Sequence, residues 1–89
     1  MFVKFNYDNF PNIYVTLGKL NSIEEFNILT NEWLELYEQK IPFTFIFDST
    51  NLEVYNLKYS FKMSEFIYKL KKKSIQYLQK SIIIVNNSF

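Results

Sequence analysis

The segment IPFTFIFDSTN, residues 41–51, decides the fold that we expect for this chain. Every second position of its apolar part is phenylalanine, at Phe43, Phe45 and Phe47, which is the period of a strand with one buried face. Asp48 and the three polar residues after it then end the strand and favour a turn. The segment is therefore predicted to be a core strand with a carboxylate at its C-terminal end.

Two shorter alternating segments precede this strand. Residues 2–7, FVKFNY, and residues 13–17, IYVTL, both place apolar side chains at every second position. The intervening DNFPN contains a proline and two asparagines, which favour a bend. These segments are predicted to form an antiparallel hairpin.

Two amphipathic helices are also expected. The first covers about residues 22–39, begins at a capping box formed by Ser22 and Glu25, and ends before Pro42. Its apolar positions recur every three or four residues, at Phe26, Leu29, Trp33, Leu36 and Tyr37. The second covers about residues 57–73, begins at a capping Asn56 and ends in KLKKK, where positive charge complements the helix dipole. It is expected to bury Phe61 or Met63 together with Phe66, Ile67 and Leu70.

The last apolar run is SIIIV, residues 81–85, and an unbroken apolar run is typical of a strand inside a sheet. The element order is therefore β-β-α-β-α-β. Right-handed crossovers make the strands that follow the helices parallel. We expect an α/β fold in a single small domain over residues 1–89, with a four-stranded mixed sheet and both helices on one face.

The strand alternation assigns side chains to the two faces of this sheet. The helix-covered face should carry Val3, Phe5, Tyr7, Ile13, Val15, Leu17, Phe43, Phe45 and Phe47. The opposite face should carry Lys4, Asn6, Tyr14, Thr16, Thr44 and Ile46. The second set is too polar for a core, so we expect a partly exposed face that is suited to docking.

The composition excludes several chemistries. The chain has no Cys and no His, which excludes cysteine or histidine catalysis and the usual zinc or copper sites. Gly18 is the only glycine, so glycine-rich phosphate loops are ruled out. All ten basic residues are Lys and the net charge is +1, so no bulk field attracts nucleic acid. We therefore expect no enzymatic activity, no cofactor and no metal site.

The sequence also gives an expectation for location. No stretch approaches the roughly 20 apolar residues that span a bilayer. The first ten residues, MFVKFNYDNF, lack the basic and then apolar pattern of a signal peptide. A cytoplasmic protein is expected.

The element order, the strand that ends in Asp48 and the SIIIVNN segment resemble the STAS domain, the family of bacterial anti-sigma-factor antagonists and transporter tails. The resemblance implies a second Asp about eight residues later, followed by Ser-Ser-Gly. Here Asn56 stands in that place, followed by Leu57, Lys58 and Tyr59, so the phosphoacceptor Ser is missing. The family fold continues with a further helix and usually a strand, so this chain is expected to be a degenerate and C-terminally short version.

Candidate contacts for a ligand or partner are Asp48, Asn51, Asn56 and Asn86. Asp48 follows a parallel strand, where open α/β sheets bind ligands, and it would form a polar crevice with Asn51 and Asn86. The alternative is that the Asp48 carboxylate accepts the backbone amides of its own turn.

A second candidate site is basic. Lys69, Lys72 and Lys73 are candidate contacts for an anionic surface, with aromatic residues nearby. The alternative is a solvated, charged helix end.

Our functional hypothesis is a non-catalytic, STAS-like interaction module that binds another protein or itself, because the chain combines many aromatic residues with few catalytic residue types. The alternative hypothesis is a carrier of an apolar small molecule or lipid. Nucleic acid is not an expected partner, and a membrane surface is only a weak candidate.

Overall fold

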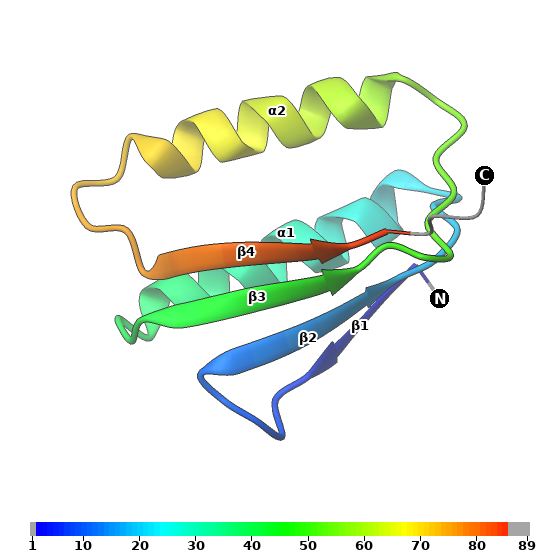
Figure 1. Ribbon diagram of the computed structural model, residues 1–89. Coiled ribbons are helices and arrows are strands. Elements are labelled where there is room, and N and C mark those ends of the chain that lie inside the picture. The colour runs from blue at the N-terminus through cyan, green and yellow to red at the C-terminus, as the bar shows by residue number, and fades with distance from the viewer. Residues whose placement is uncertain (1, 86–89) are drawn as a thin grey trace.

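The computed structural model describes residues 2–85, which form a four-stranded sheet and two helices (Figure 1). The elements in chain order are β1 (Val3–Asn6), β2 (Asn12–Leu17), α1 (Ile23–Glu38), β3 (Phe43–Asp48), α2 (Lys58–Lys71) and β4 (Leu78–Ile84). The predicted α/β class and the order β-β-α-β-α-β are confirmed.

The sheet follows the chain, with strand order β1-β2-β3-β4. β1 and β2 are antiparallel, whereas β2, β3 and β4 run parallel to one another. Each helix therefore connects two neighbouring parallel strands, as a right-handed crossover does. The consequence is that β1 and β4 are the two edges of the sheet.

Local sequence explains where the helices begin. Ser22 Oγ accepts the backbone amide of Glu25 at 3.3 Å, which is one half of the predicted capping box. The Glu25 carboxylate accepts the amide of Asn21 at 2.9 Å rather than that of Ser22. At α2 the N-cap residue is Leu57, which makes no side-chain cap, and not Asn56 as predicted. Asn56 lies one residue earlier, where its Oδ1 accepts the amide of Lys58 at 3.0 Å.

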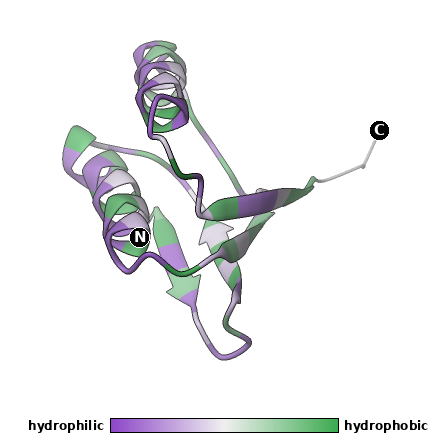
Figure 2. Cartoon of the chain, turned by 90° about the vertical axis from the view of Figure 1, so that its left-hand side faces the viewer, coloured by the Kyte–Doolittle hydropathy of each residue, from purple (hydrophilic) through white to green (hydrophobic). Residues whose placement is uncertain are grey.

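Both helices cover the same face of the sheet, as predicted (Figure 2). Beneath them, Ile13, Val15, Phe43 and Phe45 have almost no exposed surface. Trp33 of α1 joins the layers: its ring makes edge contacts with Phe45 of β3 at 5.0 Å and with Phe66 of α2 at 5.2 Å between centroids. The core is therefore an aromatic cluster between the central strands and the two helices.

The opposite face is uncovered by any described element. Strand register aligns Tyr14, Ile46 and Ile82 directly across β2, β3 and β4. Tyr14 and Ile82 are exposed and Ile46 is half-buried, so this row is an apolar stripe on the outer face. The predicted partly exposed face is confirmed.

Several details differ from the sequence-based expectations. SIIIV does not lie inside the sheet: its residues belong to or follow β4, which is an edge strand that begins earlier, at Leu78. An unbroken apolar run does not distinguish an interior strand from an edge strand, because sheet order depends on contacts between distant segments.

Some side chains are also less buried than expected. Tyr7 is 37% exposed and Phe47 is only half-buried, because they lie at strand ends near the rim of the core. In α2, Phe61 points to solvent and Met63 takes the inner position.

Candidate functional site

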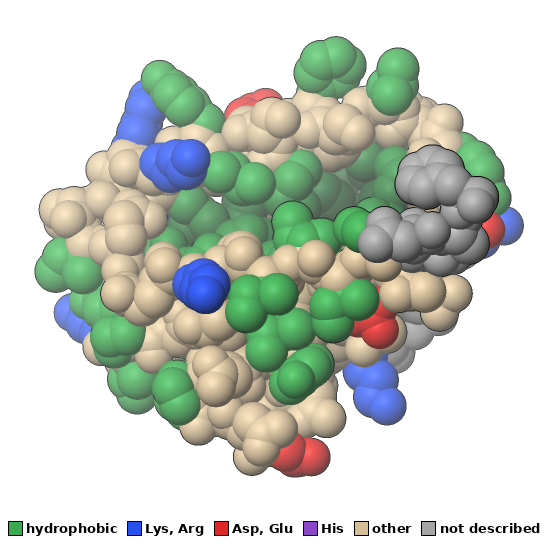
Figure 3. Space-filling view, viewed as in Figure 1, with side chains coloured by type: hydrophobic (Ala, Val, Ile, Leu, Met, Phe, Trp, Pro, Cys, Tyr) green, Lys and Arg blue, Asp and Glu red, His purple; other side chains and the backbone are tan. Residues whose placement is uncertain are grey.

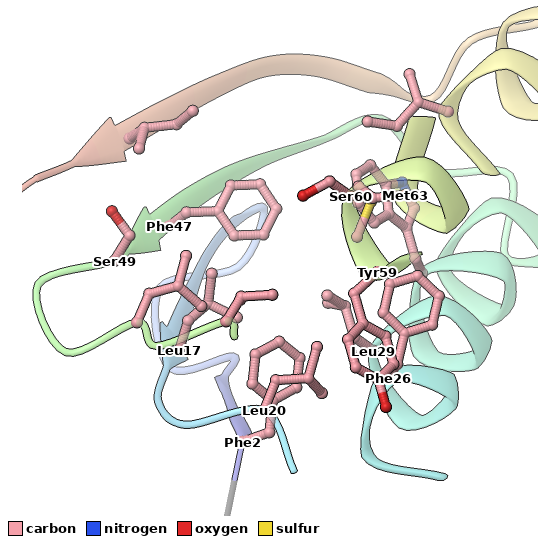
Figure 4. A pocket seen from close by; sticks show the side chains of 15 residues that line it. Phe2, Leu17, Leu20, Phe26, Leu29, Phe47, Ser49, Tyr59, Ser60 and Met63 are labelled. Atoms are coloured by element: carbon pink, nitrogen blue, oxygen red, sulfur yellow. The ribbon is translucent and has the colours of Figure 1, made fainter. Parts of the chain in front are cut away.

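An apolar cavity of about 440 Å³ lies between α2, α1 and the helix-covered face of the sheet. Figure 4 shows Phe47 and Leu17 on the sheet side, and Tyr59, Phe26 and Leu29 on the helix side. The space-filling view shows apolar side chains gathered in the hollow between α2 and β4 (Figure 3). The cavity is therefore open to solvent along that side.

The cavity exists because α2 is held at its two ends. Only Tyr59 near the start and Leu70 near the end of α2 are buried. Tyr59 packs on Phe26, with centroids 5.9 Å apart. Near the other end, the Leu70 carbonyl accepts the Gln76 side-chain amide at 2.8 Å. Between these anchors, the half-buried side chains of Met63 and Ile67 line the cavity.

Among residues 2–85, one buried side-chain polar atom has no hydrogen-bond partner. Trp33 lines the cavity, is 5% exposed, and its Nε1 is buried without a hydrogen-bond acceptor in the part of the chain that the structure describes. A buried unsatisfied donor costs roughly 1–3 kcal/mol. The Nε1 atom has almost no accessible surface, so the indole N–H does not face the open part of the cavity.

The remaining polar side chains that line the cavity are those of Ser49, Ser60 and Tyr59. Ser49 Oγ donates to the Ile84 carbonyl at 2.7 Å, and Ser60 lies on the first turn of α2. Figure 4 shows the Ser60 hydroxyl pointing into the cavity and the Ser49 hydroxyl pointing away from it. None of the residues that line the cavity carries a charge.

The sequence did not indicate several of these cavity residues because they lie in loops. Leu52 and Val54 belong to the segment between β3 and α2, which pairs with the segment after β2 through Lys19 and Glu53. The only indication of them in the sequence was that two apolar residues interrupt a polar loop.

A second feature is the free edge of the sheet. β4 is exposed along nearly its whole length, including Ile82 at 41%, Ile83 at 63% and Ile84 at 43%. Among the described strands, β4 pairs only with β3, so the other side of β4 is an edge of the sheet. Long, apolar and unpaired edges are the strands that pair with other chains.

The structure supports the turn interpretation of Asp48. Its Oδ1 accepts the backbone amide of Thr50 at 3.0 Å. Hydrogen bonds from the Thr50 side chain and backbone lower the pKa of Asp48. Asn51 is exposed in the same turn, and Asn86 lies outside the described residues.

The predicted polar site does not coincide with the cavity. Neither Asp48, Asn51 nor Asn56 lines it. The side chains of Asp48 and Asn56 instead accept backbone amides of their own segments.

The basic segment at the end of α2 is partly occupied by its own neighbours. Lys69 forms an ion pair with Glu65 at 3.0 Å, and Lys72 Nζ lies 4.3 Å from the centroid of the Tyr68 ring. Lys73 is exposed after the helix ends. These contacts support the interpretation of Lys69 and Lys72 as part of a charged helix end. Binding of this segment to an anionic surface stays a prediction.

Within residues 2–85, no group of three or more Asp, Glu, His or Cys side chains is arranged to hold a metal ion. Among the same residues, neither helix has the length and apolar character to cross a membrane.

Comparison with models of protein families, with curated proteins and with solved structures found no match for this chain. The resemblance to the STAS domain therefore stays a prediction.

Proposed function

We propose that this chain is a non-catalytic protein–protein interaction module of STAS-like type, without a phosphoacceptor serine, and that its β4 edge pairs with β4 of a second copy. The observation that carries the proposal is the exposed apolar edge formed by β4. Strand addition there would pair the free backbone groups and cover apolar side chains.

The backbone groups available for this pairing can be identified. The Ile84 carbonyl accepts the Ser49 amide at 2.9 Å, so Ile84 directs its peptide groups toward β3. Alternate residues of a strand direct these groups to opposite sides. The N–H and C=O of Ser81 and Ile83 therefore face the free edge.

An antiparallel arrangement with Ile82 at the two-fold axis uses these groups. Ser81 of each chain then lies opposite Ile83 of the other, and each such pair exchanges two backbone hydrogen bonds. Because directly opposite residues share a face, Ile82 meets its own copy on the outer face. The apolar stripe of Tyr14, Ile46 and Ile82 thereby continues across the two-fold axis into the second sheet.

The charges of the edge are compatible with a second copy. Lys80 is the only charged residue of β4, and in this register it lies opposite Ile84 of the other chain. Ile84 is aligned with Asp48 on β3, so Lys80 and the other chain's Asp48 are two strand spacings apart, about 10 Å between Cα atoms. Each lysine thus approaches a carboxylate and not the other lysine, which favours self-pairing over repulsion.

Sedimentation velocity over a range of protein concentrations tests the proposal. The wild type should sediment as a dimer, and Ile82→Lys should sediment as a monomer because two like charges would meet at the axis. Ile28→Lys is the matched control, since Ile28 is similarly exposed but lies on α1. A monomeric wild type, or dimers that survive Ile82→Lys, would overturn the proposal.

A second variant separates strand pairing from general loss of apolar surface. Ser81→Pro removes an N–H that faces the free edge and leaves the hydrogen bonds between β4 and β3 in place. We expect a folded monomer by circular dichroism and sedimentation. A folded Ser81→Pro dimer would show that the copies meet through another surface.

A further inference from the structure

We propose that the outer face of α2 docks on the surface of a bilayer that contains anionic phospholipid, with apolar side chains at the level of the headgroups and lysines around them. This surface is separate from the β4 edge, and its binding does not depend on self-pairing.

An apolar stripe runs along the side of α2 that faces away from the sheet. Leu57 at the N-cap, Phe61 and Tyr68 are 76%, 74% and 61% exposed. Their spacing of four and seven residues places them on one face of the helix, opposite the buried Tyr59 and Leu70. Apolar side chains project from this outer side of α2 in the space-filling view (Figure 3). Large apolar side chains that share one exposed face are typical of a surface that contacts a partner.

The charge around this stripe is strongly positive. Residues 58–73 contain six lysines and one glutamate, a formal net charge of +5 in a chain whose net charge is +1. All six lysines are exposed, and they are Lys58, Lys62, Lys69, Lys71, Lys72 and Lys73. The ion pair of Lys69 with Glu65 is the only one among residues 2–85, and it lies in solvent, so it leaves most of this charge in place. Clusters of four to eight basic residues on an amphipathic helix are typical of binding to anionic lipid.

The charge of α1 has the opposite sign. Residues 23–38 contain five glutamates and no lysine. An anionic surface therefore attracts α2 and repels α1, which orients the domain as it approaches. The outer stripe of α2 is then the part of the molecule that reaches the headgroups.

The combination of lysine with apolar side chains favours a membrane over other anionic partners. A specific phosphate or carboxylate is best bound by the bidentate guanidinium of arginine, and this chain has none. Lysine is a point charge on a flexible stem, which suits headgroups that move. A nucleic-acid backbone offers no apolar layer to Leu57 and Phe61, whereas the boundary between headgroups and acyl chains does.

Co-sedimentation with vesicles tests the docking. The wild type should bind vesicles of phosphatidylcholine with about 30% phosphatidylserine, and should bind vesicles of phosphatidylcholine alone at least about tenfold more weakly. Raising the salt concentration from about 0.1 M to about 1 M should release most of the bound protein, because the Debye length falls from about 10 Å to about 3 Å. No binding to the anionic vesicles, or equal binding to both kinds, would refute the proposal.

Charge reversal tests whether α2 is the surface that binds. Lys58→Glu combined with Lys62→Glu should weaken binding to the anionic vesicles at least about tenfold, since each lysine near such a surface contributes roughly a factor of five. The matched control is Lys4→Glu combined with Lys40→Glu, which changes the net charge equally at exposed positions outside α2. The control should bind within about threefold of the wild type. Equal losses in the two variants, both folded by circular dichroism, would overturn the assignment to α2.

A further pair of variants tests the apolar stripe. Leu57→Ser combined with Phe61→Ala shortens both side chains and suits the helix, because Ser is favoured at an N-cap and Ala inside a helix. Binding to the anionic vesicles should fall at least about fivefold, whereas Ile28→Ala combined with Leu34→Ala, at exposed positions of α1, should change it by less than about twofold. Unchanged binding of the stripe variant would make this surface a general polyanion site, open equally to a DNA duplex, and would refute lipid docking.

Discussion

Phe45 shows how single side chains hold this small domain together. It has no exposed surface, and its ring lies near four other aromatic rings, those of Phe5, Trp33, Phe43 and Phe47. Its neighbour Thr44 points to the outer face and is only half-buried. Adjacent residues of one strand therefore contribute very differently to stability.

Phe45→Ala should lower the free energy of unfolding by roughly 3–5 kcal/mol, because it leaves a void among these rings. Thr44→Ala should lower it by less than about 1 kcal/mol. Urea denaturation followed by circular dichroism measures both changes. Equal destabilisation by the two substitutions would contradict a sheet with only one covered face.

Tyr7 connects the end of β1 to α1 through a hydrogen bond from its hydroxyl to the Glu32 carboxylate. Partial burial, together with this bond and the charge of Glu32, raises the pKa of Tyr7. The unfolded chain has the ordinary tyrosine pKa of about 10. The stability from this contact is therefore fully present below about pH 10 and is lost as the pH rises further.

Tyr7→Phe should remove this part of the pH dependence. Between about pH 9 and pH 11 the wild type should lose more stability than the variant, because its unfolded state releases a proton that its folded state retains. Denaturation midpoints at both pH values measure the difference. Parallel losses in the two proteins would show that the contact is not formed in solution.

At the scale of elements, the two helices differ in how firmly they are attached. α1 buries Phe26, Leu29, Thr30, Trp33, Leu36 and Tyr37, which recur along its inner face. α2 buries only Tyr59 and Leu70 and spans the cavity between them. The free energy that holds α2 on the sheet is therefore smaller.

Native-state hydrogen exchange should show this difference directly. Amides in the middle of α2 should exchange faster than those in the middle of α1, because α2 can open without exposing the rest of the core. Amides of β2 and β3 are the internal standard for global unfolding. Equal protection of the two helices would mean that α2 opens only when the whole domain unfolds.

At the scale of the whole molecule, pairing through β4 would link stability to protein concentration. A partner that binds only the folded chain raises its apparent stability by mass action. The thermal midpoint of the wild type should therefore rise with protein concentration, whereas that of Ile82→Lys should not. Calorimetry at two concentrations about tenfold apart measures this shift, and a concentration-independent wild type would argue against an obligatory pair.

Much of the fold could be predicted from local patterns. Period-two alternation identified β1, β2 and β3, and helical spacing with the Ser22 cap identified α1 within a residue or two at each end. The candidate site was harder to predict. Asp48 was a candidate because it is a carboxylate at the end of a strand, but its side chain accepts a hydrogen bond from its own turn. The cavity is instead lined by apolar side chains from the sheet and both helices.

The sequence by itself determined the kinds of elements, their order and the buried face of β3, because these depend on side-chain periodicity along short segments of chain. Only the tertiary structure decided that β4 is an outer strand of the sheet, that α2 stands over a cavity, and that the Trp33 N–H finds no acceptor among residues 2–85. These features depend on which distant segments pack together and how closely. Such packing is set by the fit of many side chains at once, which no local pattern records.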